Sequence, residues 1–588
     1  MGPDAWLTLV VVLAVLVALV RDLTSPATAV FAGTVALLIT GVIDVTDAFA
    51  GFSNSGPITV AALYVLAAAV EKTGALSPIM RRTLGEKGTL RLPLLRLLAP
   101  TVATSAFLNN TPIVAMLAPQ VIAWAERRRM SPSKLLMPLS FGAILGGVVT
   151  VIGTSTNLVV SGQMDAAGLE PIGFFEIAKV GLPVAVVGTI LIVALAPRVL
   201  PARRSVRQGM LDEANRFTVE MVVDPGGPMD GRTVEEAGLR HLAGVFLAAV
   251  DRGDTVIAPV RPETVLRGNN RLRFVGRSDE VLDLRSMRGL RSAEEEHVLS
   301  LDPMVRYFEA VVGAESPLVG RTLVDVGFRA RYQAAVLAIS RSGQLVDAKL
   351  GTVSLRVGDT LIVIADPGFR ERWRDRLDFI LVAEMDGSPP TTSRKARFVG
   401  VLLLGLVMLA AMEIVPILQG SLVAALLLIG FRILSPDEAR RSIDLEVIGV
   451  IAAAFGLAAA VESSGLAETV ALGLVGIFEP MGSTGVLLGL VLTTVVLTEL
   501  VTNNAAALLM FPIAVAAANA QGLDPRGAAI AVAVAASASF LTPIGYQTNT
   551  MVYGPGGYRF SDYARLGTPL TLVMIATIVL MVPVFWPA

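Results

Sequence analysis

Apolar and polar positions divide the chain into two long hydrophobic blocks with one polar block between them. In residues 1–198 and 397–588, apolar runs approach the roughly 20 residues that a helix needs to cross a bilayer. Residues 199–396 are instead charged, and short Val- and Ile-rich runs alternate there with turn residues. The pattern predicts a polytopic α-helical membrane protein with an α+β insert.

The two hydrophobic blocks carry the same landmarks in the same order. Matching residues lie 391 to 393 positions apart, a register that chance would not maintain. The pairs are Glu71 and Glu462, Asn110 and Asn503, Pro119 and Pro512, Gly153 and Gly545, and Asn157 and Asn549. We therefore expect two copies of one unit, membrane repeat 1 over residues 1–198 and membrane repeat 2 over residues 397–588.

Basic residues indicate how the blocks lie in the membrane. Lys and Arg cluster in alternate loops, such as 81–96 and 127–134, whereas the loops at 44–56 and 162–176 carry acids and no basic residue. Because basic loops stay on the cytoplasmic side, this alternation places residues 199–396 in the cytoplasm and both termini outside.

One apolar segment in each block lies between two loops of the same side. We expect it to form a re-entrant hairpin of two half-length helices, at about 93–126 in the first repeat and about 481–521 in the second. Each repeat then has five spanning helices plus one hairpin, and the odd number of crossings inverts the second repeat. Inverted repeats with broken helices at the midplane are a recurrent design of secondary transporters.

Polar clusters fall at the expected hairpin tips. The segments FLNNTPIVAMLAP (107–119) and VTNNAAALLMFP (501–512) are each followed by a Gly-containing interruption, VIGTSTNLVVSG (151–162) or LTPIGYQTNTMVYGPGG (541–557). Non-helical backbone at membrane depth is tolerated where it lines a cavity or is packed in protein. Hydroxyl and carbonyl oxygens suit Na⁺, and helix N-termini suit an anion. The pattern favours paired cation sites beside an anion site; the alternative is that these polar residues only hold helices together.

Composition narrows the chemistry. The chain is 54% hydrophobic, has no Cys, has two His and carries a net charge of −1. His241 and His297 both lie outside the apolar runs. Thiolate or His-based metal centres, enzymatic catalysis and nucleic-acid binding are therefore not expected. Glu499, in VLTELVTNN, is an acid inside the second hairpin opposite Ala106, and we interpret it as a proton-coupling residue, as part of a cation site, or as a paired structural carboxylate.

These landmarks resemble the divalent anion/sodium symporter family of the ion transporter superfamily, over about two thirds of the chain. That family has Ser-Asn-Thr at each tip and a Gly-Thr-Pro-Pro-Asn-like break, where this chain has NNT, TNN, GTSTN and GYQTN. The resemblance implies Na⁺ ligands at Ser105, Asn109, Asn110 and Gly153, and at Thr498, Thr502, Asn503 and Gly545. It implies anion contacts at Asn110, Thr111, Thr154, Asn503, Asn504, Tyr546 and Gln547. The departures from the family motifs favour an inorganic oxyanion such as sulfate over a dicarboxylate.

The polar insert contains a second, smaller duplication. GRTVEEAGLR (231–240) matches GRTLVDVGFR (320–329), and LRGNNRL (266–272) matches LRVGDTL (355–361), both 89 residues apart. The insert resembles a tandem of TrkA-C domains, which we place at residues 211–292 and 300–384. The resemblance implies cytoplasmic sensor modules with a possible nucleotide ligand and, together with the membrane family, a homodimer. The alternative is an assembly module that binds no ligand.

The patterns together predict a Na⁺-coupled secondary symporter of a small divalent anion, sulfate before dicarboxylate, that works by alternating access and is regulated through the TrkA-C-like modules. Proton-coupled or arsenite-type anion transport, with Glu499 titrating, is one alternative. An anion-sensing membrane receptor without net flux is another. We expect a multi-pass protein of the cell inner membrane or plasma membrane, in contact with lipid.

Overall fold

The computed structural model describes most of the chain. The residues outside the description are 22, 76–89, 129, 204–217, 240–241, 243–244, 254–255, 258–259, 277–286, 293–305, 314–315, 342–343, 347, 349, 374–375, 377, 385–394, 544 and 588. The expected boundaries of the two insert domains fall partly in these segments, and they stay predictions.

Along the chain, one helical block precedes the strand-containing insert and a second block follows it. The first block contains α1 (Pro3–Val20), α2 (Pro26–Ile39), α3 (Val45–Phe49), η1 (Ala50–Phe52), α4 (Ser55–Thr73), α6 (Arg91–Ser105), α7 (Asn110–Arg127), η2 (Pro132–Lys134), α8 (Leu136–Gly147), α9 (Ser155–Ala166) and α10 (Ala178–Val199). The second contains α15 (Ala396–Ala411), α16 (Ile417–Gly430), α17 (Pro436–Ser442), α18 (Leu445–Ser463), α19 (Leu466–Phe478), η4 (Glu479–Met481), α20 (Gly482–Leu500), α21 (Asn503–Gln521), α22 (Pro525–Ala536), α23 (Gln547–Tyr553) and α24 (Phe560–Phe585).

Local sequence signals explain where many of these helices begin. Ser25 caps α2 ahead of a proline in its first turn, and Ser435 forms a capping box with Glu438 at α17. Asp524 caps α22, again ahead of a proline. Thr502 caps α21, the second arm of the second hairpin. The side chains before these helices thus satisfy backbone amides that the first turn leaves free.

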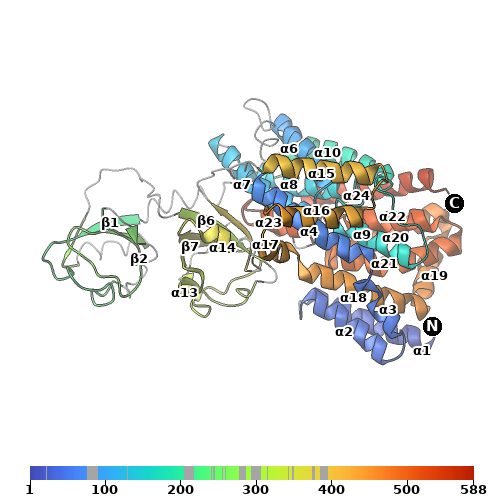
Figure 1. Cartoon of the computed structure of the whole chain (residues 1–588), viewed down its shortest axis with the longest axis horizontal. Helices are drawn as coiled ribbons and strands as arrows, with labels where there is room; N and C mark the ends of the chain where they lie inside the picture. Colours follow the sequence, from blue (N-terminus) through green and yellow to red (C-terminus); the bar gives the residue numbers. More distant parts are fainter. Residues whose placement is uncertain are drawn as a thin grey trace.

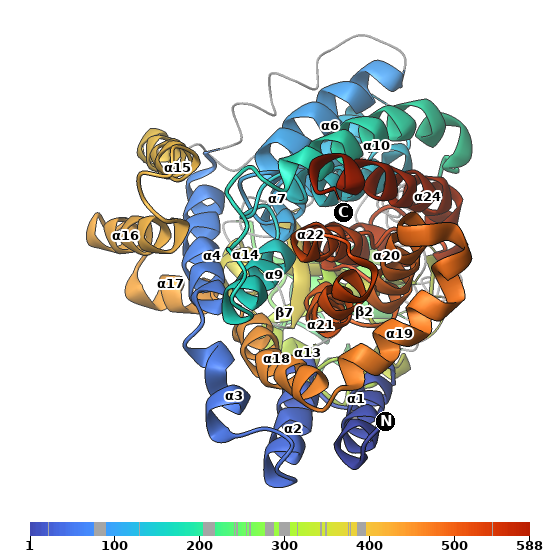
Figure 2. The ribbon, with the colours of Figure 1, turned by 90° about the vertical axis from the view of Figure 1, so that its right-hand side faces the viewer.

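The described helices of the two blocks pack in matching pairs. Helix α2 packs on α18 of the other block, and its counterpart α16 packs on α4. The last helices, α10 and α24, pack on each other, and α21 packs on α9 as α23 packs on α7. Figure 2 shows α20, α21 and α22 in the middle of the helical body, with α1 and α2 on one side and α15 and α16 on another. The blocks therefore interlock instead of forming two separate bundles. Their inverted relation stays a prediction.

A pair of helices meets at each expected tip, but these arms are not half-length, and their re-entrant placement stays a prediction. Helix α6 has 15 residues, α7 has 18, and α20 and α21 have 19 each. At 1.5 Å per residue these arms span about 22 to 28 Å. The expectation of half-length helices is wrong, because no helix ends midway between its loop and the tip. Pro100, Pro119 and Pro512 lie inside these helices without ending them.

Length and apolarity make seven helical segments of the described chain long enough to cross a membrane. They are Pro3–Val20, Val45–Thr73, Ala178–Val199, Leu445–Ser463, Gly482–Leu500, Asn503–Gln521 and Phe560–Phe585. Five shorter apolar helices accompany them. These helices identify a multi-pass membrane protein. The number of ten spanning helices stays a prediction, because two of the seven segments are hairpin arms.

The insert contains two five-stranded antiparallel sheets of the same topology. The first has strands β1 (Thr218–Val223), β2 (Val245–Asp251), β3 (Val256–Ile257), β4 (Arg271–Gly276) and β5 (Leu290–Ser292), in the order β3-β2-β4-β1-β5. The second has strands β6 (Arg306–Val312), β7 (Ala334–Arg341), β8 (Gln344–Leu345), β9 (Thr360–Ala365) and β10 (Phe379–Glu384), in the order β10-β6-β9-β7-β8. Three short helices connect these strands, α13 (Phe328–Tyr332), η3 (Leu350–Thr352) and α14 (Phe369–Trp373).

Strand order and register agree with the 89-residue duplication in the sequence. Taking β6 to β10 as counterparts of β1 to β5, the two orders are the same. The isolated bridges Thr233–Val265 and Thr322–Ser354 are also 89 residues apart. We call the sheets and their helices module 1 (residues 218–292) and module 2 (residues 306–384). Their identity as TrkA-C domains stays a prediction.

Module 2 lies against the helical body, and module 1 lies beyond it (Figure 1). Both termini lie at the other end of the molecule from the modules (Figure 1). Strand β10 contacts α7, and Val311 and Leu381 belong to the same buried cluster as the helical core. Module 2 is thus packed onto the membrane region, next to one arm of the first hairpin.

Candidate functional site

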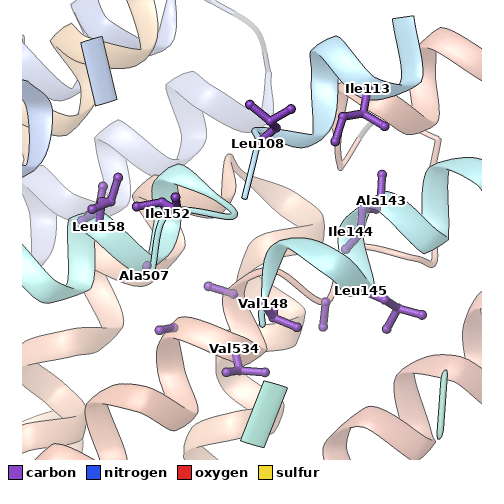
Figure 3. Close-up of a cluster of buried hydrophobic side chains, with 14 of the residues drawn as sticks. Leu108, Ile113, Ala143, Ile144, Leu145, Val148, Ile152, Leu158, Ala507 and Val534 are labelled. Atoms are coloured by element: carbon purple, nitrogen blue, oxygen red, sulfur yellow. The ribbon is translucent and has the colours of Figure 1, made fainter. Parts of the chain in front are cut away.

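Two hairpin tips and two broken helices form the candidate site. The first tip lies between α6 and α7, and the first break separates α8 from α9. The second tip lies between α20 and α21, and the second break separates α22 from α23. Buried apolar side chains surround these elements, among them Val148, Ile152, Ala507 and Val534 (Figure 3). The polar residues of the site are therefore held in a well-packed apolar frame.

One hydroxyl in each half ties the hairpin tip to the helix before the break. The hydroxyl is Ser105 in the first half and its counterpart Thr498 in the second, and both are fully buried. Each lies within hydrogen-bond distance of a tip amide oxygen and of a backbone carbonyl. The distances are 2.6 Å and 2.8 Å from Ser105 to Asn110 and Ala143, and 2.9 Å and 2.5 Å from Thr498 to Asn503 and Ala536.

One buried asparagine in each half holds the open backbone of the break. Asn157 donates to the carbonyls of Gly147 and Thr150, at 3.1 and 2.8 Å. Its counterpart Asn549 donates to the carbonyls at the equivalent positions, Ser539 and Thr542, at 2.9 and 3.2 Å. A broken helix leaves carbonyls without intrahelical partners, and an amide group can satisfy two of them at once. The repeated TN of GTSTN and GYQTN is therefore a structural support for the break.

Each tip contacts the break of the other half. Asn110 Nδ2 donates to the Tyr546 hydroxyl at 2.6 Å, and Thr111 Oγ1 donates to Gln547 Oε1 at 3.2 Å. In the reverse direction, the hydroxyls of Ser155 and Thr156 both lie 3.2 Å from Asn504 Oδ1. The side chains of one half thus complete the site of the other.

Two counterpart residues meet at the centre of this arrangement. Thr154 and Tyr546 occupy equivalent positions in the two breaks, and their hydroxyls are 3.4 Å apart. Equivalent residues of two related units can touch only near the axis that relates them. The predicted anion-contact residues therefore surround the boundary between the halves. Asn110 and Thr154 are buried, whereas Gln547 is exposed.

The remaining predicted Na⁺ ligands have less uniform surroundings. Gly153 lies in the first break, where a Cβ would come within 2.5 Å of the Gly147 carbonyl oxygen. Asn109 interacts with the hydroxyl of Tyr64 on α4. The exposed Thr502 uses its hydroxyl to accept from the Ala505 amide at 3.4 Å. These placements leave the ligand assignments as predictions.

The surroundings of the second break include the predicted residues Glu499 and Gly545 and one residue that was not predicted, Ser539. Glu499 Oε1 accepts from the Leu541 amide at 2.8 Å, and Gly545 lies beside this acid. Ser539, which corresponds to Gly147, is fully buried here and was not predicted to belong to the site. The constant spacing between the two halves could have identified Ser539, because it places this serine opposite a glycine of the first half. No cluster of three His, Cys, Asp or Glu side chains occurs among the described residues.

The fold and this doubly built site define a multi-pass membrane transporter. The chain belongs to the citrate transporter family, whose family model matches residues 10–535 and 481–588. This result confirms the expected ion transporter superfamily. The narrower divalent anion/sodium symporter family is not the one matched.

Full-length relatives support the same class. The chain is 35% identical to a putative sulfur deprivation response regulator of Chlamydomonas reinhardtii, covering 94% of this chain and 97% of that protein. It is 34% identical to an uncharacterized transporter of Synechocystis, covering 98% and 96%. It is 27% identical to sodium/sulfate cotransporter 1 of Chlamydomonas reinhardtii, covering 92% and 85%. Similarity extends over membrane blocks and insert together.

Proposed function

We propose that the protein is a Na⁺-coupled symporter of a small divalent oxyanion, with sulfate preferred over dicarboxylates. The observation that carries this proposal is the reciprocal contact of each hairpin tip with the break of the other half. Three helices of twelve or more residues begin in this cluster, α7 at Asn110, α9 at Ser155 and α21 at Asn503. Their first-turn amides and positive dipole ends favour an anion, and neutral amides and hydroxyls supply further hydrogen bonds.

Sodium completes the electrostatics of this proposal. Helix dipoles provide only about half a positive charge each, so a divalent anion at membrane depth requires further compensation. Na⁺ held by the hydroxyl and amide oxygens of the two tips supplies it. The relatives named sodium/sulfate cotransporters support this coupling ion and this substrate.

Alternating access follows from the shared construction of the site. Because each tip is bonded to the other half, movement of the hairpins and broken helices against the outer helices carries the site as one unit. The anion then meets one face of the membrane at a time.

Uptake by proteoliposomes tests the proposal. We expect radiolabelled sulfate to accumulate in an imposed Na⁺ gradient and not in choline, with unlabelled sulfate competing better than succinate or citrate. Uptake that follows an imposed proton gradient instead would establish the proton-coupled alternative. Preferential competition by citrate would assign the substrate suggested by the family name.

An anion-sensing receptor is the second candidate function. It is favoured by the relative named a sulfur deprivation response regulator and by the packing of module 2 on the transport region. A receptor would bind sulfate in the purified state and show no flux in the same proteoliposomes. We further propose that module 2 regulates transport. A Cβ at Gly554, just after α23, would clash with Thr360 of module 2, so the two backbones are in close contact.

A further inference from the structure

Two buried oxygen atoms beside the second break have no hydrogen-bond partner in the described part of the chain. They are Oε2 of Glu499, near the end of α20, and Oγ of Ser539, in the break after α22. Ser539 is 0% exposed. An unpaired carboxylate oxygen and an unpaired hydroxyl at membrane depth are both costly. Their presence together indicates that something else occupies the space between them.

The two atoms converge on one point beside Gly545. A Cβ on this glycine would clash with Ser539 Oγ and would lie 3.0 Å from Glu499 Oε2 and 3.1 Å from Thr542 Oγ1. Three side-chain oxygens from two elements therefore lie close together beside the Cα of Gly545. The Thr542 hydroxyl accepts from the Gly545 amide, at 3.0 Å, and interacts with the Glu499 carboxylate, which fixes its position.

The first half has the same backbone without this cluster. Glu499 corresponds to Ala106 and Ser539 to Gly147. The hydroxyl of Thr150, the counterpart of Thr542, donates to the Ala106 carbonyl instead of facing a carboxylate. The converging oxygens are thus a specific feature of the second half and not a consequence of breaking a helix.

We propose that Glu499, Ser539 and Thr542 form a binding site for one Na⁺ ion. Carboxylate and hydroxyl oxygens are hard donors, and one carboxylate neutralises one monovalent cation. The described residues provide no group of three acidic or imidazole side chains that would suit a multivalent metal. Thr498, the neighbour of Glu499 in the chain, is not part of this site, since its hydroxyl is already bonded to Asn503 and Ala536.

This inference deepens the proposed symport and rests on it for its physiological meaning. It also makes the two halves unequal toward Na⁺. The first half offers neutral ligands only, whereas the second has, in addition to the ligands of its tip, a site that includes a full negative charge. Charge-assisted contacts are roughly twice as strong as neutral ones, so the second half is expected to bind Na⁺ more tightly.

Sodium binding to the purified full-length protein tests the site without requiring transport. The midpoint of thermal unfolding is measured against NaCl concentration, with choline chloride holding ionic strength constant. Wild-type protein is expected to be stabilised saturably by Na⁺. Glu499→Gln should raise the half-saturating Na⁺ concentration about 10-fold or more, and Ser539→Gly, which copies the first half, about 3-fold.

The matched control is Glu462→Gln, since Glu462 is an exposed acid on α18. It should leave the half-saturating Na⁺ concentration unchanged. Wild-type half-saturation in both Glu499→Gln and Ser539→Gly would overturn the site. If Glu499→Gln does not fold, Ser539→Gly and Gly545→Ala decide the question, because both should weaken Na⁺ binding while retaining the carboxylate.

The result is separable from that of the uptake assay. Loss of Na⁺ stabilisation in these variants, with no Na⁺-dependent sulfate uptake by the wild type, would retain the cation site and reject the symport. Na⁺-dependent uptake by the wild type with unaltered Na⁺ binding in the variants would retain the symport and reject this site.

Discussion

The two halves of the membrane region share one support for their broken helices and differ in the groups placed on it. Asn157 and Asn549 each bind two carbonyls at equivalent positions, so the backbone is held in the same way twice. Around this support the first half has alanine and glycine where the second has Glu499 and Ser539. The comparison shows that the two halves share their backbone geometry, whereas the residues that differ between them supply the chemical differences.

The largest expected effect comes from removing the amide of either tip. Asn110→Ala and Asn503→Ala each delete the contact of the tip with its own hydroxyl, and Asn110→Ala also deletes the contact with Tyr546. We expect both variants to lose Na⁺-driven sulfate uptake by about 100-fold or more, because positioning and charge compensation fail together.

The control for these variants is Asn519→Ala. Asn519 lies on α21, the same arm as Asn503, but is exposed. It should retain uptake and membrane insertion. Normal uptake by Asn110→Ala or Asn503→Ala would show that the tips are structural only.

A second pair of substitutions should show which tip depends more on its hydrogen bonds to the break of the other half. Thr111 donates to one exposed partner, Gln547, whereas Asn504 accepts from two hydroxyls, those of Ser155 and Thr156. We therefore expect Asn504→Ala to raise the KM for sulfate about 30-fold and Thr111→Ala about 5-fold, since each lost hydrogen bond contributes about 1 kcal/mol. Initial uptake rates against sulfate concentration measure both. Equal KM values would mean that the anion contacts the halves equally.

The supports of the two breaks are expected to contribute equally to the stability of the protein. Asn157→Ala and Asn549→Ala each remove two hydrogen bonds to backbone carbonyls of the break, which costs about 2 kcal/mol. We expect both to lower the midpoint of thermal unfolding of the purified protein by a similar amount. If only one variant lowers the midpoint of thermal unfolding, the two asparagines do not play the same role. The variant with the lower midpoint would then identify the break that depends on its asparagine.

The sequence alone predicted those features of the molecule that follow from the constant spacing between repeated residues. Hydrophobic runs, Gly-containing breaks and the 391-to-393-residue spacing located both hairpins, and the 89-residue spacing located two sheets of one topology. It could not show that Asn110 contacts Tyr546 or that Asn504 contacts Ser155, because those contacts depend on how the halves interlock. The length of the hairpin arms was also mistaken, since polar residues mark a tip and carry no information on where its helices begin.

The two modules of the insert offer the same kind of comparison on a smaller scale. In module 2, Arg341 forms two hydrogen bonds with the buried Asp359, at 2.8 and 2.7 Å. In module 1, Arg252 contacts the Val265 carbonyl and Asn270 replaces the aspartate, so the ion pair is missing from this part of the described structure. The module with the ion pair is the one that lies on the helical body. Asp359 belongs to the turn with Gly358 and Thr360, which contacts the end of α23.

The smallest expected effect on transport comes from loosening this turn. Hydrogen bonding to Asp359 raises the pKa of Arg341, so this group stays charged, and its stabilising contribution persists, throughout the range from pH 5 to 9. Arg341→Gln removes the charge and leaves a buried carboxylate unpaired. We expect faster amide exchange in residues 356–365 and a change of about 2- to 3-fold in the rate of sulfate uptake, whereas Arg252→Gln should alter neither. If Arg341→Gln accelerates exchange and leaves uptake unchanged, module 2 is anchored to the transport region without regulating it.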